Sequence, residues 1–156
     1  MDRSSIPLRQ FEKSPGVFGL MATRRIARGE VAASLRAVAP VKVRSRYSIQ
    51  IDQFHHLDTR DPEKPGFDDF INHGCSPNLL FDVGTLEFRA IRDIQPGEEV
   101  LLNYCATEEE LSEPFTCHCG SPDCYGVVSG FRFLRRTQQE PLKGLVSPWL
   151  KTKYGL

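Results

Sequence analysis

Short apolar segments alternate with charged turns along the chain, and few of them have the spacing of an amphipathic helix. Residues 18–22 and 31–35 are apolar runs on either side of an Arg-Gly-Glu turn at 28–30, so they predict two strands. Residues 47–51 read Tyr-Ser-Ile-Gln-Ile, which is the two-residue period of a half-buried strand. Residues 58–69 are charged and hold two prolines, which predicts a surface loop.

The second half of the chain continues this pattern. Residues 79–81 and 86–91 flank Asp-Val-Gly-Thr and predict a hairpin that turns at Gly84. The turn Gln-Pro-Gly-Glu at 95–98 precedes a predicted strand at 100–104. Short helices are predicted at 107–113, where acids come early, and at 145–150, where Pro148 breaks the pattern. We therefore expect a mostly-β fold of small curved sheets with few short helices.

Three cysteines lie within eight residues, at positions 117, 119 and 124. Cys117 and Cys119 are too close for an ordinary disulfide, but both can bind one metal ion. Thiolates suit a tetrahedral zinc site, which needs four ligands. The residue types leave the fourth ligand open between Cys75, Cys105 and His118. The alternative is a chance cluster of buried thiols, which is unusual in a chain with only five cysteines.

Composition narrows the class of protein. A chain of 156 residues suits one domain with a real core. The 20 basic and 20 acidic residues cancel, which argues against direct nucleic-acid binding through bulk charge. Residues 1–10 do not have the pattern of a signal peptide, and no apolar run is long enough for a membrane span. We expect a soluble intracellular protein, in the cytoplasm or nucleus, without membrane association.

Four segments together resemble SET-domain proteins. Residues 70–78 read F-I-N-H-G-C-S-P-N, similar to the family signature F-x-N-H-S-C-x-P-N. Residues 19–30 resemble the opening cofactor segment, and residues 90–104 resemble the closing segment that ends in the catalytic tyrosine. The cysteine cluster resembles the post-SET motif. Four motifs in the family's order, over roughly residues 14–131, are far more specific than any one of them.

The resemblance implies a small protein-lysine N-methyltransferase with a β-clip (SET) fold and a pseudoknot-like C-terminal segment. It implies S-adenosylmethionine and zinc as cofactors, and a lysine-containing protein or peptide substrate, either a histone tail or a non-histone protein. Tyr104 would be catalytic, and Tyr47 would help to form the wall of the active site. Cys75 would complete the zinc site with Cys117, Cys119 and Cys124, which leaves Cys105 as a buried thiol. The implied cofactor-binding residues are Phe18, Gly19, Leu20, Asn72, His73 and Phe131.

The resemblance also predicts how the chain is divided. Residues 1–113 would form the SET domain, 114–135 the post-SET zinc-binding segment and 136–156 a C-terminal extension. The chain departs from the family pattern at Val17, where a glycine is usual, at Gly74, where a serine is usual, and at Asn103, where an acid is usual. The departures at Val17 and Asn103 support one alternative, a non-catalytic SET-like module that binds a cofactor or protein. A second alternative is a structural zinc domain without a cofactor pocket.

Overall fold

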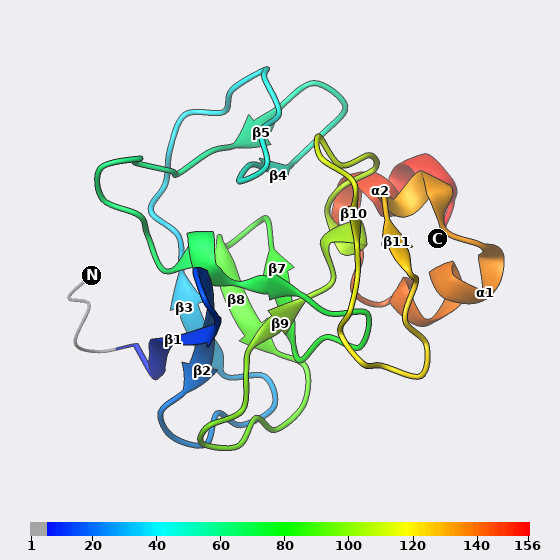
Figure 1. The fold of residues 1–156 in the computed structure, drawn as a ribbon. Coiled ribbons are helices and arrows are strands. Elements are labelled where there is room, and N and C mark those ends of the chain that lie inside the picture. Colours follow the sequence, from blue (N-terminus) through cyan, green and yellow to red (C-terminus); the bar gives the residue numbers. More distant parts are fainter. Residues whose placement is uncertain (1–5) are drawn as a thin grey trace.

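Small sheets make up the body of the protein in the computed structural model, which describes residues 6–156 (Figure 1). Strands β1 (Leu8–Ser14) and β2 (Val17–Ala22) form an antiparallel pair. A three-stranded antiparallel sheet follows the order β3 (Val31–Ser34), β8 (Glu87–Ala90), β7 (Leu79–Asp82). The predicted mostly-β architecture with few short helices is confirmed.

Two short strands that are distant in sequence form a parallel pair. Strand β6 (Asn72–His73) pairs with β9 (Leu101–Leu102), although residues 74–100 lie between them in the sequence. The Gly74 N–H donates to the Leu102 carbonyl at 2.8 Å. Buried Asn78 holds the other end, because its Oδ1 accepts the Leu101 N–H at 2.8 Å. The segment that carries the F-x-N-H pattern is thereby held against the strand that leads to Tyr104.

The hairpin of β4 (Ile49–Gln50) and β5 (His56–Leu57) belongs to an arm that projects from the body, at the top of Figure 1. The predicted strand is shorter than expected, and its faces are reversed. Ser48 and Gln50 are the buried residues, while the isoleucines are only half-buried. Gln50 is buried because it lies against the segment after Tyr104, where its backbone and its side chain both form hydrogen bonds.

The apolar residues form two clusters. The first comprises strands β1–β3, β7 and β8 and includes Phe88 and Ile94, which are almost completely buried. The second comprises Cys75 and residues between 105 and 150, with Phe131 and Leu150 at its centre. The hairpin of β10 (Phe115–Thr116) and β11 (Val127–Val128) contributes to the second cluster. The predicted post-SET segment and C-terminal extension therefore share one core.

The helices are short. The segment predicted to be broken at Pro148 instead begins a helix there, because proline fits the first helical position and Ser147 Oγ accepts the Leu150 N–H. That helix, α2, has seven residues and is the longest in the described part of the chain, too short to cross a bilayer. The helical elements are η1 (Asp68–Phe70), η2 (Tyr104–Ala106), η3 (Phe131–Phe133), α1 (Arg136–Gln139), η4 (Glu140–Leu142) and α2 (Pro148–Tyr154).

The helix predicted at 107–113 is wrong. The backbone of this segment bonds across to residues 129–131 rather than along itself. The Leu111 N–H donates to the Ser129 carbonyl at 2.8 Å, and the Glu108 carbonyl accepts the Phe131 N–H at 2.9 Å. Long-range pairing has thus replaced the helical hydrogen bonds that local sequence favours.

The hairpin predicted around Gly84 is confirmed, but its strained position lies elsewhere. Among the residues that the structure describes, Leu86 is the one non-glycine residue with positive φ, at 58°, whereas Gly84 does not adopt such a conformation. Asp82 Oδ1 accepts the Gly84 N–H at 2.8 Å and the Thr85 N–H at 3.2 Å. The aspartate therefore forms the turn, and the left-handed residue follows it.

Candidate active site and metal centre

Tyr104 begins the 3₁₀ turn η2, and one residue, Asn103, separates it from β9. Its hydroxyl donates to the Ile71 carbonyl at 2.7 Å, next to Asn72. Asn103 caps the turn, since its Oδ1 accepts the Cys105 N–H at 3.1 Å. Burial raises the pKa of Tyr104 to about 12, so the phenol stays protonated at neutral pH. The site therefore presents a neutral hydroxyl group.

Tyr47 lies on the arm, close enough to Tyr104 to affect it electrostatically. After burial, the charges of Arg46, Glu99 and Tyr47 are the other influences on the pKa of Tyr104. The Tyr47 ring is half-buried and the Arg60 guanidinium lies 3.9 Å from its centroid. The role of Tyr47 as part of the active-site wall stays a prediction.

Asn72 contacts the predicted cofactor strand. Its Nδ2 donates to the Phe18 carbonyl at 2.9 Å and to Glu99 Oε1 at 3.0 Å. Gly19 makes this approach possible, because a Cβ there would lie 2.7 Å from Glu99 Oε1 and 3.0 Å from Asn72 Nδ2. Leu20 is buried in the first core, and the Phe18 ring is 38% exposed. Phe18 and Asn72 therefore share one surface, with an exposed aromatic ring at its edge, and Gly19 and Leu20 lie buried behind it.

His73 is buried between this surface and the cysteines. Burial lowers its pKa to about 4, so the imidazole is neutral at physiological pH. Its Nδ1 accepts the Tyr104 N–H at 3.1 Å, and its Nε2 lies 3.3 Å from Cys75 Sγ. Tyr104 and Phe115 pack edge-on against the ring. His73 thus holds a single orientation through both nitrogen atoms.

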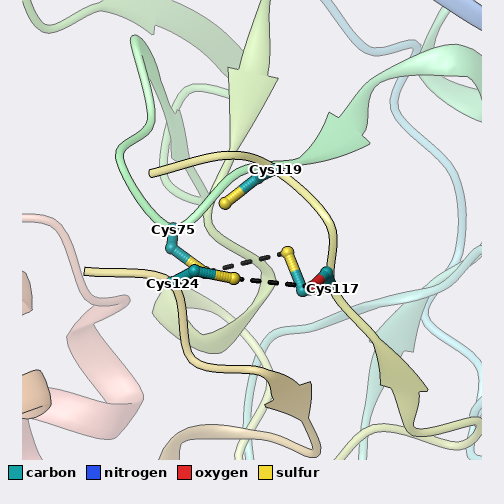
Figure 2. A group of neighbouring side chains, drawn as sticks. All are labelled: Cys75, Cys117, Cys119 and Cys124. Carbon is teal, nitrogen blue, oxygen red and sulfur yellow. Dashed lines mark hydrogen bonds between the residues drawn. The ribbon is translucent and has the colours of Figure 1, made fainter. Parts of the chain in front are cut away.

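Cys75 and the three C-terminal cysteines meet, as the family resemblance implies. All four Sγ atoms lie within 4.8 Å of one another, and Figure 2 shows the side chains converging from separate segments. The Cys75 and Cys117 sulfurs are 3.9 Å apart. A tetrahedral zinc ion with Zn–S bonds of about 2.3 Å implies sulfur separations of about 3.8 Å. The donor set and its spacing therefore fit zinc.

The remaining predicted residues lie around this centre. His118 is exposed and is not part of the cluster, and Cys105 is fully buried outside it. Phe131, the aromatic assigned to the cofactor, is fully buried in the second core, with its ring 4.9 Å from that of Tyr154. The structure thus places Phe131 in the core, and its assignment to the cofactor stays a prediction.

Two residues that sequence reasoning did not select also contribute to the site. Glu99 accepts the Asn72 amide and forms an ion pair with Lys13 at 2.6 Å. Tyr125 donates its N–H to Cys75 Sγ at 3.3 Å, and its hydroxyl accepts from Asn103 Nδ2 at 2.8 Å. In the sequence, Glu99 lies within the closing segment at 90–104 and Tyr125 directly follows Cys124. These positions were the available sequence signals, but the residue types alone do not indicate which groups they would hydrogen-bond.

The unusual residue Gly74 has a steric explanation. A Cβ at this position would lie 2.9 Å from Leu101 Cδ1 and 3.1 Å from Leu101 Cβ. The leucine side chain thus occupies the space that a serine at position 74 would need. Packing against Leu101 therefore explains the glycine at position 74, and Asn103 caps the turn η2.

Comparison with known proteins shows the family. Residues 17–105, more than half of the chain, match the SET domain. A methyltransferase of Aspergillus flavus, flvH, is 43% identical over 63 residues, which cover 39% of this chain and 35% of that protein. A histone-lysine N-methyltransferase, H3 lysine-36 specific, of Aspergillus oryzae is 40% identical over 77 residues, or 46% of this chain and 7% of that protein. The chain thus matches a minor part of each relative.

A solved structure shows the same fold. KRYPTONITE, in complex with mCHH DNA, an H3(1–15) peptide and S-adenosylhomocysteine, aligns with a TM-score of 0.61 at 20% identity. The alignment covers 77% of this chain and 29% of KRYPTONITE.

Proposed function

This chain belongs to the SET domain family, and from that premise we propose that it is an S-adenosylmethionine-dependent protein-lysine N-methyltransferase. The single observation that carries the proposal is the convergence on the β6–β9 pair. Asn72, His73 and Tyr104 come together there, next to the four cysteines. S-adenosylmethionine, when bound, would supply the methyl group as a sulfonium. The chain's own residues must bind the cofactor, align the amine and exclude water.

The surface shared by Phe18 and Asn72 suits the amino-acid end of the cofactor. Asn72 Nδ2 is occupied by the Phe18 carbonyl and Glu99, which leaves Oδ1 as an acceptor for an ammonium group. The carboxylate of Glu99 adds negative charge beside it. The exposed Phe18 ring provides an apolar face that could stack on a base.

Tyr104 is the proposed catalytic residue. Its phenol is neutral and already donates to the Ile71 carbonyl, so its oxygen lone pairs remain available to a substrate amine. A hydroxyl with a pKa of about 12 is a poor general base at neutral pH, and we assign it the role of orienting the amine. The lysine must lose its proton before transfer, and burial in an apolar channel favours the neutral amine.

The four cysteines would hold zinc in a structural role. All four ligands come from protein, so no coordination position remains open for catalysis. The ion would fasten residues 117–124 to Cys75, which directly follows the His73 and Gly74 backbone. Metal binding is thereby coupled to the position of the proposed active site.

The proposal is tested by two measurements on the same protein. We expect S-adenosylhomocysteine to raise the melting temperature, because a ligand that binds only the native state must stabilise it. We expect labelled methyl transfer from S-adenosylmethionine to core histones or to lysate protein, with amino-acid analysis identifying methyl-lysine. Stabilisation without transfer would support a non-catalytic binding module instead, and the absence of both would leave only a structural zinc domain.

A further inference from the structure

A groove opens between the arm and the segment that follows Tyr104. Its volume is about 390 Å³, enough for one or two side chains. Glu108 connects the groove wall to the turn of Tyr104, because its carboxylate accepts the Gln50 N–H and its own N–H donates to the Tyr104 carbonyl at 2.9 Å. Gln50 on one wall follows Tyr47 by three residues, and Glu109 on the other follows Tyr104 by five. Its lining residues are Lys42, Arg44, Gln50, Gln53, Phe54, His56, Glu109 and Glu110.

The two walls are held together by hydrogen bonds, so the groove is preformed. Glu108 Oε1 accepts the Gln50 N–H at 2.8 Å, and the Gln50 side-chain oxygen accepts the Glu109 N–H at 2.9 Å. Arg44 donates to the Glu110 carbonyl at 3.0 Å. A bound side chain would therefore meet fixed partners rather than having to order a loop.

The charge that remains in the groove is positive. Both acids on its wall are compensated from the C-terminal side: Glu109 by Lys153 at 2.8 Å and Tyr154 at 2.7 Å, and Glu110 by Arg132 at 3.0 Å. Lys42 has no ion-pair partner among residues 6–156. The groove therefore presents the ammonium group of Lys42, whereas the carboxylates of Glu109 and Glu110 already have partners.

Two further features favour an anionic or hydrogen-bonding ligand. His56, which lines the groove, is 5% exposed, and its Nδ1 is the one buried side-chain polar atom of the described chain without a hydrogen-bond partner. Arg46 and Arg60 both lie near the Tyr47 ring, at 5.9 and 3.9 Å from its centroid. The Tyr47 ring on the arm therefore lies beside two cationic side chains.

We propose that this groove binds an acidic side chain of the substrate, next to the lysine that is methylated, so that the enzyme prefers lysines in acidic segments over lysines in basic tails. The inference rests on the proposed function and names the substrate class of the same site. Like charges across an interface disfavour binding, and opposite charges favour it.

The test uses three peptides that differ only in the three residues on each side of one central lysine: glutamates, glutamines or arginines. We expect kcat/KM to fall in that order, by roughly tenfold at each step, and the preference to weaken in high salt. Lys42→Glu, which breaks no ion pair in the described chain, should reduce the advantage of the acidic peptide by roughly tenfold. Arg9→Glu, an exposed charge reversal on β1 outside the groove, is the matched control and should leave the order unchanged.

Two results would overturn the inference while the proposed function stands: equal or better transfer to the arginine peptide by the unmodified enzyme, or an unchanged preference in Lys42→Glu. No transfer to any peptide or to lysate protein would overturn both. Arg44→Glu provides a second charge reversal in the groove, and because Arg44 also contacts Glu110, its melting temperature is measured alongside.

Discussion

The backbone N–H of Tyr104 donates a hydrogen bond of 3.1 Å to Nδ1 of His73. Because Nδ1 accepts, the neutral ring carries its proton on Nε2, which lies 3.3 Å from Cys75 Sγ and can donate to it. Such N–H···S contacts orient and stabilise metal-bound thiolates. One imidazole therefore links the backbone of the proposed catalytic residue to the proposed zinc site.

Zinc removal should consequently affect both stability and methyl transfer. We expect one zinc ion per chain by elemental analysis, and chelation should lower the melting temperature by roughly 10 °C or more, because structural zinc contributes directly to folding. Methyl transfer should be lost with the metal and return when zinc is restored.

Cysteine variants supply the control for this prediction. Cys75→Ser should lower the zinc content below one per chain, whereas Cys105→Ala should leave it at one, since Cys105 is buried outside the cluster. A chelated protein that melts at the original temperature would contradict the structural role of the metal.

Tyr104→Phe should reduce methyl transfer by roughly 100-fold or more, because the orienting hydroxyl is removed. The loss of its 2.7 Å bond to Ile71 should cost only about 1 kcal/mol of unfolding free energy. Stabilisation by S-adenosylhomocysteine should persist. Tyr154→Phe, which also loses a 2.7 Å hydrogen bond but far along the chain in α2, should retain activity on a neutral peptide; comparable activity of the two variants would refute the catalytic role of Tyr104.

Glu99→Ala should raise the KM for S-adenosylmethionine by roughly tenfold with a smaller change in kcat. We expect this because Glu99 accepts a hydrogen bond from the Asn72 amide and so keeps Asn72 Oδ1 available to accept from the cofactor. Lys13→Met removes only the ion pair behind Glu99 and should change KM much less, because Lys13 is largely exposed. A fall in kcat with unchanged KM would contradict this assignment.

Glu108 should make stability depend on pH. Burial raises its pKa to about 7, above the model-compound value of 4.5, although the Gln50 N–H opposes the shift. Between these values the folded chain binds more protons than the unfolded chain, so this contribution to stability is present below about pH 4.5 and is lost as pH rises through about 7. Glu108→Gln keeps an acceptor for Gln50 and removes the dependence.

The measurement is the unfolding free energy of both proteins between pH 5 and 8. The variant should become the more stable of the two as pH rises, with a change in the difference of about 3 kcal/mol at most. Comparing the two proteins cancels titrations that they share, and parallel profiles would show that Glu108 does not titrate in this range.

Local patterns predicted many elements correctly because their signals are local. The apolar runs at β2 and β3 and the turn signals around β7–β8 depend on neighbours in sequence. The helix predicted at 107–113 is absent, and the buried face of the strand predicted at 47–51 is reversed, for one reason. These segments pair with each other and with residues 129–131, and such distant partners overrode the local preference.

The sequence by itself determined the residue types of the proposed chemistry: three closely spaced thiols, a tyrosine just after an apolar segment, and an Asn-His pair beside a fourth cysteine. Only the tertiary structure decided that Cys75 meets Cys117, which lies 42 positions later in the sequence. It also decided that His73 hydrogen-bonds the backbone of Tyr104, and that the arm forms a groove with residues 109 and 110. Residue type and spacing dictate which interactions a segment can form. Which of them form depends on the path of the chain, since contacts between distant segments arise only after many other segments have packed.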